Sequence, residues 1–364
     1  PMAVNTKRVF YVKYLSDPKF AELLGARADV TLERLENDSP AAQVAPVLAA
    51  AHAYQVGASR DELASHFHVT DALLARTPNL LLASSNGAGF DTIDVEACTR
   101  AGVLAVNQTG GNAEAVAEHV LGMLLCLTKR IGEADRVMRR PGAETLDRNA
   151  YMGRDATGKT IGIIGLGNVG TRVAELCRLL FRMRVLACDP YLTAEQIAAR
   201  GAEKMELDAL LAASDFVSLN CPRNKETLGL MGAAQFARMR PHAYFITTAR
   251  GGIHDEAALA DALSRRAIPG AGLDVWFREP PPPDHPLMAF DTVIVSPHTA
   301  GVTHEARINR ATIAAEQLLG GLDGHAPPRL LNPEAWPAFA ARFERILGFA
   351  PVSRAGLAGG GAPN

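Results

Sequence analysis

Apolar runs alternate with helical patterns through the first part of the chain. Helical patterns lie between the runs, for example at residues 41–50 and 71–76. The runs have the length of buried strands, and they lie at residues 9–12, 30–32, 53–56, 80–83 and 103–106. Because strands that alternate with helices form a parallel sheet covered on both faces, this half predicts an α/β domain.

A long helical pattern at residues 112–131 separates this half from a second series of alternating elements. A further helical pattern covers residues 169–180. Strands are expected at residues 161–164, 185–188, 216–220, 244–247, 270–273 and 293–295. The pattern therefore predicts a second parallel-sheet domain, with the long helix crossing into it from the first.

Length and charge narrow the class of protein. With 364 residues, the chain is too long for one ordinary core and about right for two domains. The formal net charge of −2 gives no attraction for nucleic acid or an anionic membrane, so neither is expected as a partner. The longest apolar stretch, residues 119–128, is far short of the roughly 20 residues that a transmembrane helix needs. No apolar run with a cleavage site follows Lys7 and Arg8, so no signal peptide is expected.

The cysteines and histidines outside the motifs described below predict neither a disulfide framework nor a metal site. No third ligand follows His66 and His68 at a useful spacing, and His119 is expected to be a packed helix residue. The cysteines are scattered and odd in number, at Cys98, Cys126, Cys177, Cys188 and Cys221. We therefore expect reduced core thiols in a cytoplasmic protein, with no bound metal.

Residues 161–170 read IGIIGLGNVG, a GxGxxG pattern between a predicted strand and a predicted helix. Gly165 permits a tight turn, Gly167 lets backbone amides approach a pyrophosphate, and Gly170 lets the helix pack close to the strand. The helix N-terminus would then offer N–H groups and a partial positive charge to the phosphates. The alternative is a glycine turn without a ligand, but the flanking elements favour a dinucleotide site.

Asp189 ends the next predicted strand, nineteen residues after Gly170. A carboxylate at this place can accept hydrogen bonds from both ribose hydroxyls of NAD, and its charge repels the 2′-phosphate of NADP. Pro190 and Tyr191 follow, with no arginine to bind that phosphate. The sequence thus favours NAD over NADP, bound by a domain inserted into another domain.

Three further segments follow predicted strands: TTARGG at residues 247–252, GLDVWFREP at residues 272–280 and SPHTAGVT at residues 296–303. Ligands of open α/β sheets bind outside the carboxyl ends of the strands, so Arg250, Glu279 and His298 are expected to converge near a nicotinamide.

Each of these side chains suits one part of hydride transfer between a nicotinamide and a 2-hydroxy or 2-keto acid. His298 can exchange the hydroxyl proton, because the pKa of histidine lies near neutrality. Glu279 would fix its tautomer and favour its protonated form. Arg250 would bind the substrate carboxylate and polarise the carbonyl. Asp255 and Glu256 also look like paired acids, but Asp255 precedes a helical pattern and is expected to be its N-cap.

Together these segments resemble the D-isomer-specific 2-hydroxyacid dehydrogenase family, which includes D-lactate, glycerate/hydroxypyruvate, phosphoglycerate and phosphite dehydrogenases. The resemblance covers residues 80–330 approximately, with the segments in the family's order and spacing. It implies two doubly wound parallel-sheet domains. A Rossmann NAD-binding domain, residues 112–299, would be inserted into a flavodoxin-like substrate domain made of residues 1–111 and 300–332, and residues 333–364 would form a C-terminal tail.

The same resemblance implies roles for individual residues. Arg250, Glu279 and His298 would be catalytic, and the amides of Ala88 and Gly89, within SSNGAGFDTID, would bind the substrate carboxylate. Asp274 would hold the nicotinamide carboxamide, Val116 would approach the nicotinamide, and Cys221–Pro222 would lie over the adenosine. The full implied set of cofactor contacts is Gly165, Gly167, Asn168, Val169, Gly170, Asp189, Cys221, Pro222, Thr227, Thr248, Ala249, Asp274 and Val116.

The resemblance implies an NAD-dependent oxidoreductase of a small-molecule 2-hydroxy or 2-keto acid, and a homodimer formed through the helix after Asn112. Thr247, Ala88 and Phe90 stand where asparagine, valine and tyrosine are commoner in the family, and the presence of Glu279 argues against formate as substrate. Two alternatives stay open: an NAD-sensing, corepressor-like binding protein, and a dehydrogenase of another small oxyanion such as phosphite. The sequence does not indicate which 2-hydroxy acid is used.

Overall fold

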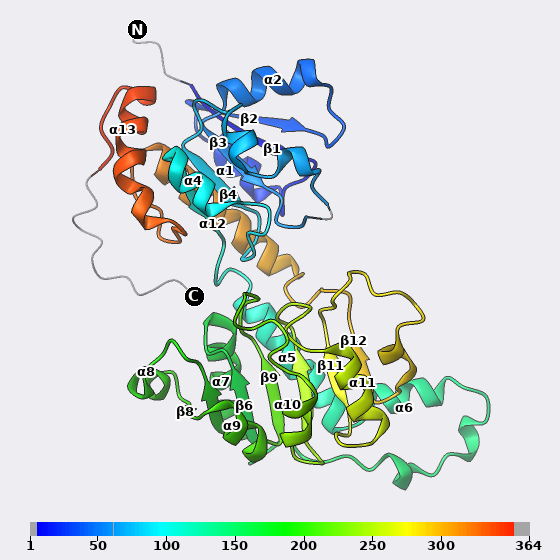
Figure 1. Cartoon of the computed structure of the whole chain (residues 1–364). Coiled ribbons are helices and arrows are strands. Elements are labelled where there is room, and N and C mark those ends of the chain that lie inside the picture. The colour runs from blue at the N-terminus through cyan, green and yellow to red at the C-terminus, as the bar shows by residue number, and fades with distance from the viewer. Residues whose placement is uncertain (1–5, 61, 353–364) are drawn as a thin grey trace. The chain divides into compact units, whose positions relative to one another are not determined.

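The computed structural model describes residues 6–60 and 62–352, and the chain divides into two compact units (Figure 1). The first unit combines Pro1–Asn112 with His304–Asn364, and the second unit is Ala113–Thr303. Because both ends of the chain belong to the first unit, the second unit is inserted into it. Each unit is built around its own parallel sheet, as the alternating apolar runs predict.

The first unit has a five-stranded sheet in the order β2-β1-β3-β4-β5, and every pairing in it is parallel. Its strands are β1 (Lys7–Val12), β2 (Val30–Leu35), β3 (Ala53–Val56), β4 (Leu82–Ser85) and β5 (Leu104–Val106). This 2-1-3-4-5 order is that of flavodoxin-like folds, which confirms the predicted fold class for this unit.

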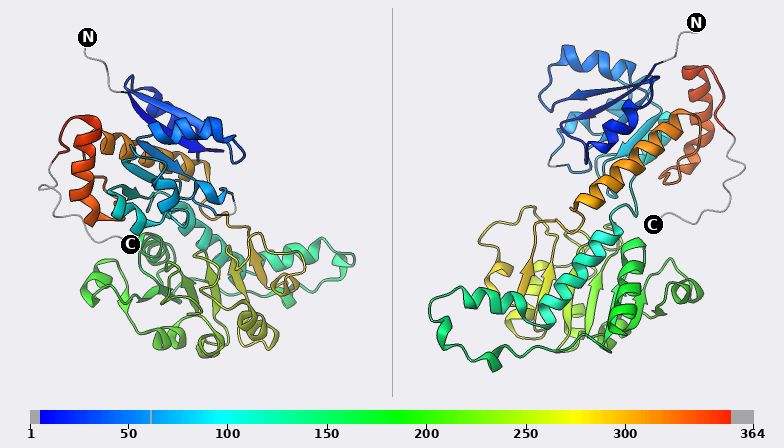
Figure 2. Two further views of the ribbon diagram at one scale, coloured as in Figure 1. Left: turned by 45° about the horizontal axis from the view of Figure 1, so that its top comes forward. Right: turned by 180° about the vertical axis from the view of Figure 1, so that it is seen from behind.

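Helices cover both faces of this sheet. One face packs against α1 (Lys19–Gly25), α12 (His304–Leu322) and α13 (Trp336–Leu347), and the other against α2 (Ala41–Ala50), α3 (Asp71–Leu74) and α4 (Val95–Ala101). In the rear view of Figure 2, α12 runs diagonally in front of the strands. Within the expected C-terminal tail, α13 begins at Trp336 and buries Phe339 and Phe343 in the same core as α12.

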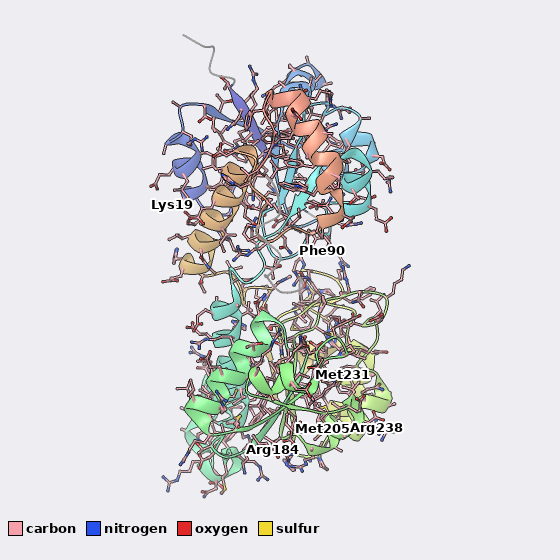
Figure 3. The ribbon with its side chains drawn as sticks, turned by 90° about the vertical axis from the view of Figure 1, so that its left-hand side faces the viewer. Lys19, Phe90, Arg184, Met205, Met231 and Arg238 are labelled. Carbon is pink, nitrogen blue, oxygen red and sulfur yellow. The ribbon has the colours of Figure 1, made fainter. Side chains whose placement is uncertain are left out.

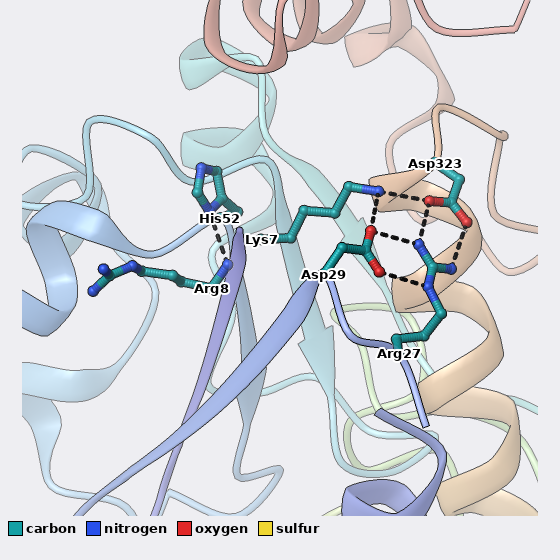
Figure 4. A network of polar contacts seen from close by, with 6 residues as sticks. All are labelled: Lys7, Arg8, Arg27, Asp29, His52 and Asp323. Atoms are coloured by element: carbon teal, nitrogen blue, oxygen red, sulfur yellow. Dashed lines mark hydrogen bonds and ion pairs between the residues drawn. The ribbon is translucent and has the colours of Figure 1, made fainter. Parts of the chain in front are cut away.

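A network of four charged side chains joins β1 and the residues before β2 to the end of α12 in the first unit (Figure 4). Lys7 donates from Nζ to Oδ1 of Asp323 at 2.6 Å and lies 3.3 Å from Oδ2 of Asp29. Arg27 donates to both carboxylates at 2.8–2.9 Å. These hydrogen bonds, led by those from Arg27, lower the pKa of Asp29 and bring the pKa of Asp323 down to about 2. The network therefore stabilises the fold above the unfolded carboxyl pKa and is lost as the pH falls through these lowered values.

The second unit has a seven-stranded sheet in the order β12-β11-β10-β9-β6-β7-β8, again with only parallel pairings. Its strands are β6 (Thr160–Ile164), β7 (Arg184–Cys188), β8 (Glu203–Lys204), β9 (Phe216–Leu219), β10 (Tyr244–Thr247), β11 (Ala271–Leu273) and β12 (Val293–Val295). The chain builds outward from β6 first on one side and then on the other. The sheet therefore has the Rossmann switch point between β6 and β9, where dinucleotides bind.

Two layers of helices cover this sheet. One layer is α5 (Ala113–Thr128), α7 (Asn168–Phe181) and α8 (Ala194–Ala199), and the other is α9 (Leu207–Ala213), α10 (Ala233–Arg238) and α11 (Glu256–Ser264). The predicted N-cap of α11 is confirmed, since the Asp255 carboxylate accepts a hydrogen bond from the amide of Ala258 at 3.0 Å.

The helix expected over residues 112–131 is α5, which ends three residues earlier than expected, and a second helix follows it. α5 ends at Thr128, and α6 (Ile131–Met138) begins after Arg130, whose backbone is left-handed at φ 55°. The guanidinium of Arg130 pairs with Glu133 at 2.7 Å in the first turn of α6. Short 3₁₀ helices complete the structure at Ser65–Phe67, Ala143–Thr145, Arg148–Tyr151, Pro286–Ala289 and Pro333–Ala335. Over residues 6–60 and 62–352, none of the helices combines the length and apolarity needed to span a bilayer.

His254 is a buried polar residue of the second unit whose side chain makes no hydrogen bond to the described residues. Its side chain is 2% exposed, and neither ring nitrogen has a hydrogen-bond partner among the described residues. Burial lowers its pKa to about 4, against the opposing charges of Glu256 and Asp255. The pKa of histidine in the unfolded chain is ~6.5. At pH values between this and the folded value, His254 is protonated in the unfolded chain but neutral in the folded chain. The free energy of unfolding therefore falls as the pH falls through this range.

We therefore predict that His254→Leu makes the stability of the fold depend less on pH below neutrality. Its melting temperature should exceed that of the wild type by a larger margin at pH 5 than at pH 8, because the variant has no imidazole to protonate in the unfolded state. Thermal unfolding followed by circular dichroism at both pH values measures the margin. His325→Leu, at an exposed position, is the control. An equal margin at the two pH values would contradict the assignment.

Candidate active site

The glycine loop joins β6 to α7, and its three glycines have different structural reasons. Gly165 has φ +87°, and a Cβ there would lie 2.7 Å from the backbone of Cys221. A Cβ on Gly170 would lie 2.2 Å from the carbonyl oxygen of Gly165. Protein packing thus accounts for these two glycines. A Cβ on Gly167, the N-cap of α7, would meet no atom within 4 Å.

Gly167 is therefore the glycine that the protein's own packing does not explain. It precedes the first turn of a 14-residue helix, where backbone N–H groups lack intrahelical acceptors and the helix dipole favours an anion. The open space in front of Gly167 fits the close approach of a dinucleotide pyrophosphate. The residues present at this loop thus fit the cofactor that the motif predicts.

Asp189 lies where the sequence predicts, at the end of β7 beside the glycine loop. Its carboxylate accepts hydrogen bonds from the amides of Leu166 and Tyr191, each at 3.0 Å, and only 7% of the residue is exposed. It therefore braces the loop in addition to any contact with a ribose. A carboxylate can accept about four hydrogen bonds, so capacity for ribose hydroxyls remains.

The sequence analysis missed Arg200, which donates from Nη1 to the carbonyl oxygen of Leu166 in the same loop. No motif marks this residue, because it follows α8 and only the fold brings it to the glycine loop.

His298 and Glu279, which lie nineteen residues apart, meet in the structure. Nδ1 of His298 donates to Oε2 of Glu279 at 2.7 Å, and Oε1 accepts from the amide of Trp276 at 3.1 Å. Burial would raise the pKa of Glu279, but the hydrogen bond and charge of His298, the Trp276 amide and the charge of Arg250 together lower it. Glu279 is therefore ionised, binds Nδ1–H and leaves Nε2 of His298 for another partner.

Arg250 lies close enough for its charge to act on Glu279, while its Nη1 donates to the carbonyl oxygen of Ala249 at 2.8 Å. A Cβ on the next residue, Gly251, would lie 1.8 Å from the carbonyl oxygen of Trp276. This position admits only glycine, and the close backbone contact brings the Arg250 loop against the segment that carries Glu279.

Asp274 anchors the loop that contains His298. Its fully buried carboxylate accepts hydrogen bonds from the Ser296 hydroxyl at 2.6 Å and from the amides of Thr299 at 2.8 Å and Ala300 at 3.0 Å. Its carbonyl oxygen accepts from the amide of His298 at 2.7 Å. His298 has a left-handed backbone, with φ 55°, which costs a non-glycine residue roughly 1–2 kcal/mol. The hydrogen bonds to Asp274 hold this conformation.

His119 is part of the same arrangement, whereas the sequence suggests only a packed helix residue. Its Nε2 lies 2.9 Å from Oγ of Ser296 and 3.8 Å from Oδ1 of Asp274. Since the Ser296 hydroxyl donates to Asp274, Nε2 of His119 must carry the proton that it shares with Ser296. Trp276 also contacts this loop, donating from Nε1 to the carbonyl oxygen of Ser296 at 3.1 Å.

The other predicted cofactor residues of the second unit lie on α5 or follow the carboxyl ends of β9 and β10. Val116 is on α5, Cys221, Pro222 and Thr227 follow β9, and Thr248 and Ala249 follow β10. Thr227 already donates to the carbonyl oxygen of Pro222 at 2.7 Å. In residues 6–60 and 62–352, no three or more His, Cys, Asp or Glu side chains are grouped so as to hold a metal ion.

In the first unit, the loop after β4 turns its carbonyl groups into the protein. The carbonyl oxygen of Gly87 accepts from the amide of Gln108 at 2.9 Å, that of Ala88 accepts from Asn107 at 2.8 Å, and that of Gly89 accepts from the Ser85 hydroxyl. The amides of Ala88 and Gly89 have no acceptor within the described part of the chain. Such unpaired amides next to one another form a binding place for an anion.

Comparison with known proteins places these motifs in one family. The model of the D-isomer specific 2-hydroxyacid dehydrogenase NAD binding domain matches residues 121–300. A glyoxylate reductase of Thermofilum pendens is 38% identical over 291 residues, which are 76% of this chain and 85% of that protein. The chain belongs to the D-isomer specific 2-hydroxyacid dehydrogenase family. Its second unit is the NAD-binding domain, and the predicted family and fold are confirmed.

Another relative is much longer than this chain. A D-3-phosphoglycerate dehydrogenase of Archaeoglobus fulgidus is 38% identical over 282 residues, which are 74% of this chain and 53% of that protein. The chain thus spans about half the length of this relative. The crystal structure of D-lactate dehydrogenase from Aquifex aeolicus, complexed with NAD and lactic acid, is 27% identical with a TM-score of 0.70. The match covers 87% of this chain and 96% of that one.

The glycine loop gives a prediction that separates folding from cofactor binding. Gly167→Ala should keep the melting temperature of the wild type, because a Cβ there meets no protein atom, but should weaken NADH binding at least about tenfold by obstructing the pyrophosphate. Gly170→Ala should instead lower the melting temperature, because its Cβ would clash with the carbonyl oxygen of Gly165. Thermal unfolding and NADH fluorescence titration measure the two effects.

Gly320→Ala is the matched control, since its Cβ also meets no atom within 4 Å but lies on α12. Unchanged NADH affinity in folded Gly167→Ala would show that no phosphate lies at this position.

Proposed function

We propose that the chain is an NAD-dependent oxidoreductase that interconverts a 2-hydroxy acid and the corresponding 2-keto acid. The observation that carries this proposal is the 2.7 Å contact between His298 and the ionised Glu279, with the charge of Arg250 close by, in an NAD-binding domain. An acid–base group and a guanidinium are the two side chains that this chemistry requires of the protein.

Bound NAD supplies the hydride acceptor, or the donor in its reduced form. His298 uses Nε2 to take the hydroxyl proton of the 2-hydroxy acid, or to return it to the oxygen of the 2-keto acid. Glu279 keeps Nδ1 protonated and stabilises the positive charge that the ring carries after accepting a proton. Arg250 binds the substrate carboxylate and stabilises negative charge on the carbonyl oxygen.

The substrate also needs partners from the first unit. The amides of Ala88 and Gly89, which have no acceptor among the described residues, suit a carboxylate, which supports this role for them. The relatives include proteins named glyoxylate reductase, which supports a small 2-keto acid as substrate.

The proposed enzyme is a homodimer in a reducing compartment such as the cytoplasm. None of the residues of α6 is buried, and Ile131 and Met138 at its ends are 53% and 64% exposed. Met152, beyond α6, is 73% exposed. Large apolar side chains exposed on this segment favour a second subunit that covers them. All five cysteines are free thiols, which favours the reducing compartment.

The direct test is NADH oxidation by the purified chain with glyoxylate, hydroxypyruvate, pyruvate and longer 2-keto acids. We expect turnover with at least one of them, and His298→Ala should lower kcat by about 10²–10⁴-fold because it removes the acid–base group. NADH fluorescence titration should give the wild-type affinity for this variant. The exposed His325→Ala is the control. Tight NADH binding without turnover on any acid would reject the proposal.

Asp189 provides a test of cofactor choice. Asp189→Asn keeps an acceptor for one loop amide and removes the negative charge, so the affinity ratio of NADH to NADPH should fall by about tenfold or more. Fluorescence titration with both cofactors measures the ratio. Asp208→Asn on α9, which removes a surface carboxylate paired with Arg238, is the charge-matched control. If the ratio does not change, the carboxylate that selects the cofactor lies elsewhere.

A further inference from the structure

Arg310 is a partly buried arginine of the first unit that has no acidic partner among the described residues. It lies on α12, and its one hydrogen bond is a long one of 3.4 Å from Nε to the carbonyl oxygen of Ala306 in the same helix. No described carboxylate lies within 4.0 Å of its guanidinium. Buried arginines are normally paired, because an uncompensated charge away from water is costly.

Two glycines make room for this side chain. A Cβ on Gly111 would lie 2.9 Å from Cγ of Arg310, so Gly111 admits its aliphatic stem. A Cβ on Gly87 would lie 3.7 Å from Nη1, so the guanidinium reaches the loop after β4. Gly87 directly precedes Ala88, whose amide has no acceptor in the described residues. The unpaired guanidinium and the unpaired amides are therefore neighbours.

The surroundings of Arg310 increase its need for an anion. Burial lowers its pKa first, and the charge of Arg307, one turn earlier on α12, lowers it further. The Tyr14 hydroxyl lies near both arginines, but it donates its hydrogen bond to the carboxylate of Glu62. Ala88 and Gly89 are partly exposed, and Phe90, which follows them and is labelled in Figure 3, is 39% exposed.

We propose that Arg310 binds a second anionic group of the substrate, so that the preferred substrates are 2-keto and 2-hydroxy acids that carry another carboxylate or a phosphate. The amides of Ala88 and Gly89 bind the first carboxylate, and the planar guanidinium binds the second group through two parallel hydrogen bonds. This assignment rests on the proposed oxidoreductase function and adds the class of substrate to it.

The test compares pairs of substrates that differ in the second charge, using the full chain and Arg310→Met. One pair is 2-oxobutyrate and oxaloacetate, and the other is hydroxypyruvate and 3-phosphooxypyruvate. The wild type should have a kcat/KM at least about tenfold higher for the doubly charged member of one pair, since a site built to bind a group rejects the analogue that lacks it. Which pair shows the preference tells a carboxylate from a phosphate.

Arg310→Met should remove this preference through KM and leave kcat/KM for the singly charged substrates within about twofold, because only the second anionic group loses its partner. Arg310→Lys keeps the charge without the planar fork and should retain part of the preference. Melting temperatures establish that both variants fold. The proposal is overturned if the wild type has no preference within either pair, or if Arg310→Met weakens both members of a pair equally.

Failure of the proposed function has a different signature, namely no turnover with any 2-keto acid. Ligand-induced thermal stabilisation then tests Arg310 without catalysis. Succinate or inorganic phosphate should raise the melting temperature of the wild type more than butyrate does, and Arg310→Met should abolish this difference. Equal shifts in the wild type and the variant would exclude an anion site at Arg310.

Discussion

The buried carboxylate of Asp274 is the interaction on which the arrangement of the catalytic groups depends. An ionised carboxylate without water is stable only if hydrogen-bond donors surround it, and the Ser296, Thr299 and Ala300 donors all come from the loop around His298. The loop therefore cannot move without exposing or orphaning a charge. That restriction holds His298 in a left-handed backbone conformation and directs its Nδ1 to Glu279.

Close contact between backbones is the second constraint on the site. Gly251 touches the carbonyl of Trp276, and Gly165 touches the backbone of Cys221, at distances that exclude any side chain. In both cases, a loop at the carboxyl end of one strand rests on the loop after another strand. The second unit thus assembles its site by stacking loops from several parallel strands, and the space at Gly167 is left for the ligand.

Most strands could be predicted because buried parallel strands are continuous apolar runs, and β3, β10 and β12 coincide with the predicted ranges. β8 was not predicted, since its two residues, Glu203 and Lys204, are polar and exposed. The break after α5 was not predicted either, because Arg130 has no sequence signal for a left-handed backbone.

The candidate site also contains some residues that the sequence predicts and others that it does not. Short segments with fixed spacing predict the residues of the glycine loop and the contact between His298 and Glu279. The contacts of His119 and Arg200 were not predicted, because these residues reach the site from α5 and from the end of α8, whose positions only the folded sheet determines. Side chains that act across elements of the fold leave no periodicity in the sequence.

Charge pairing within the first unit gives Arg310 its significance. At the far end of the same helix, Asp323 shares Lys7 and Arg27 with Asp29, so each charge of that structural network has an opposite partner at 2.6–3.3 Å. Arg310 lies on the same helix with a lowered pKa and without such a partner among the described residues. A cation that the fold leaves uncompensated beside unpaired amides is best explained by an anion that arrives with the substrate.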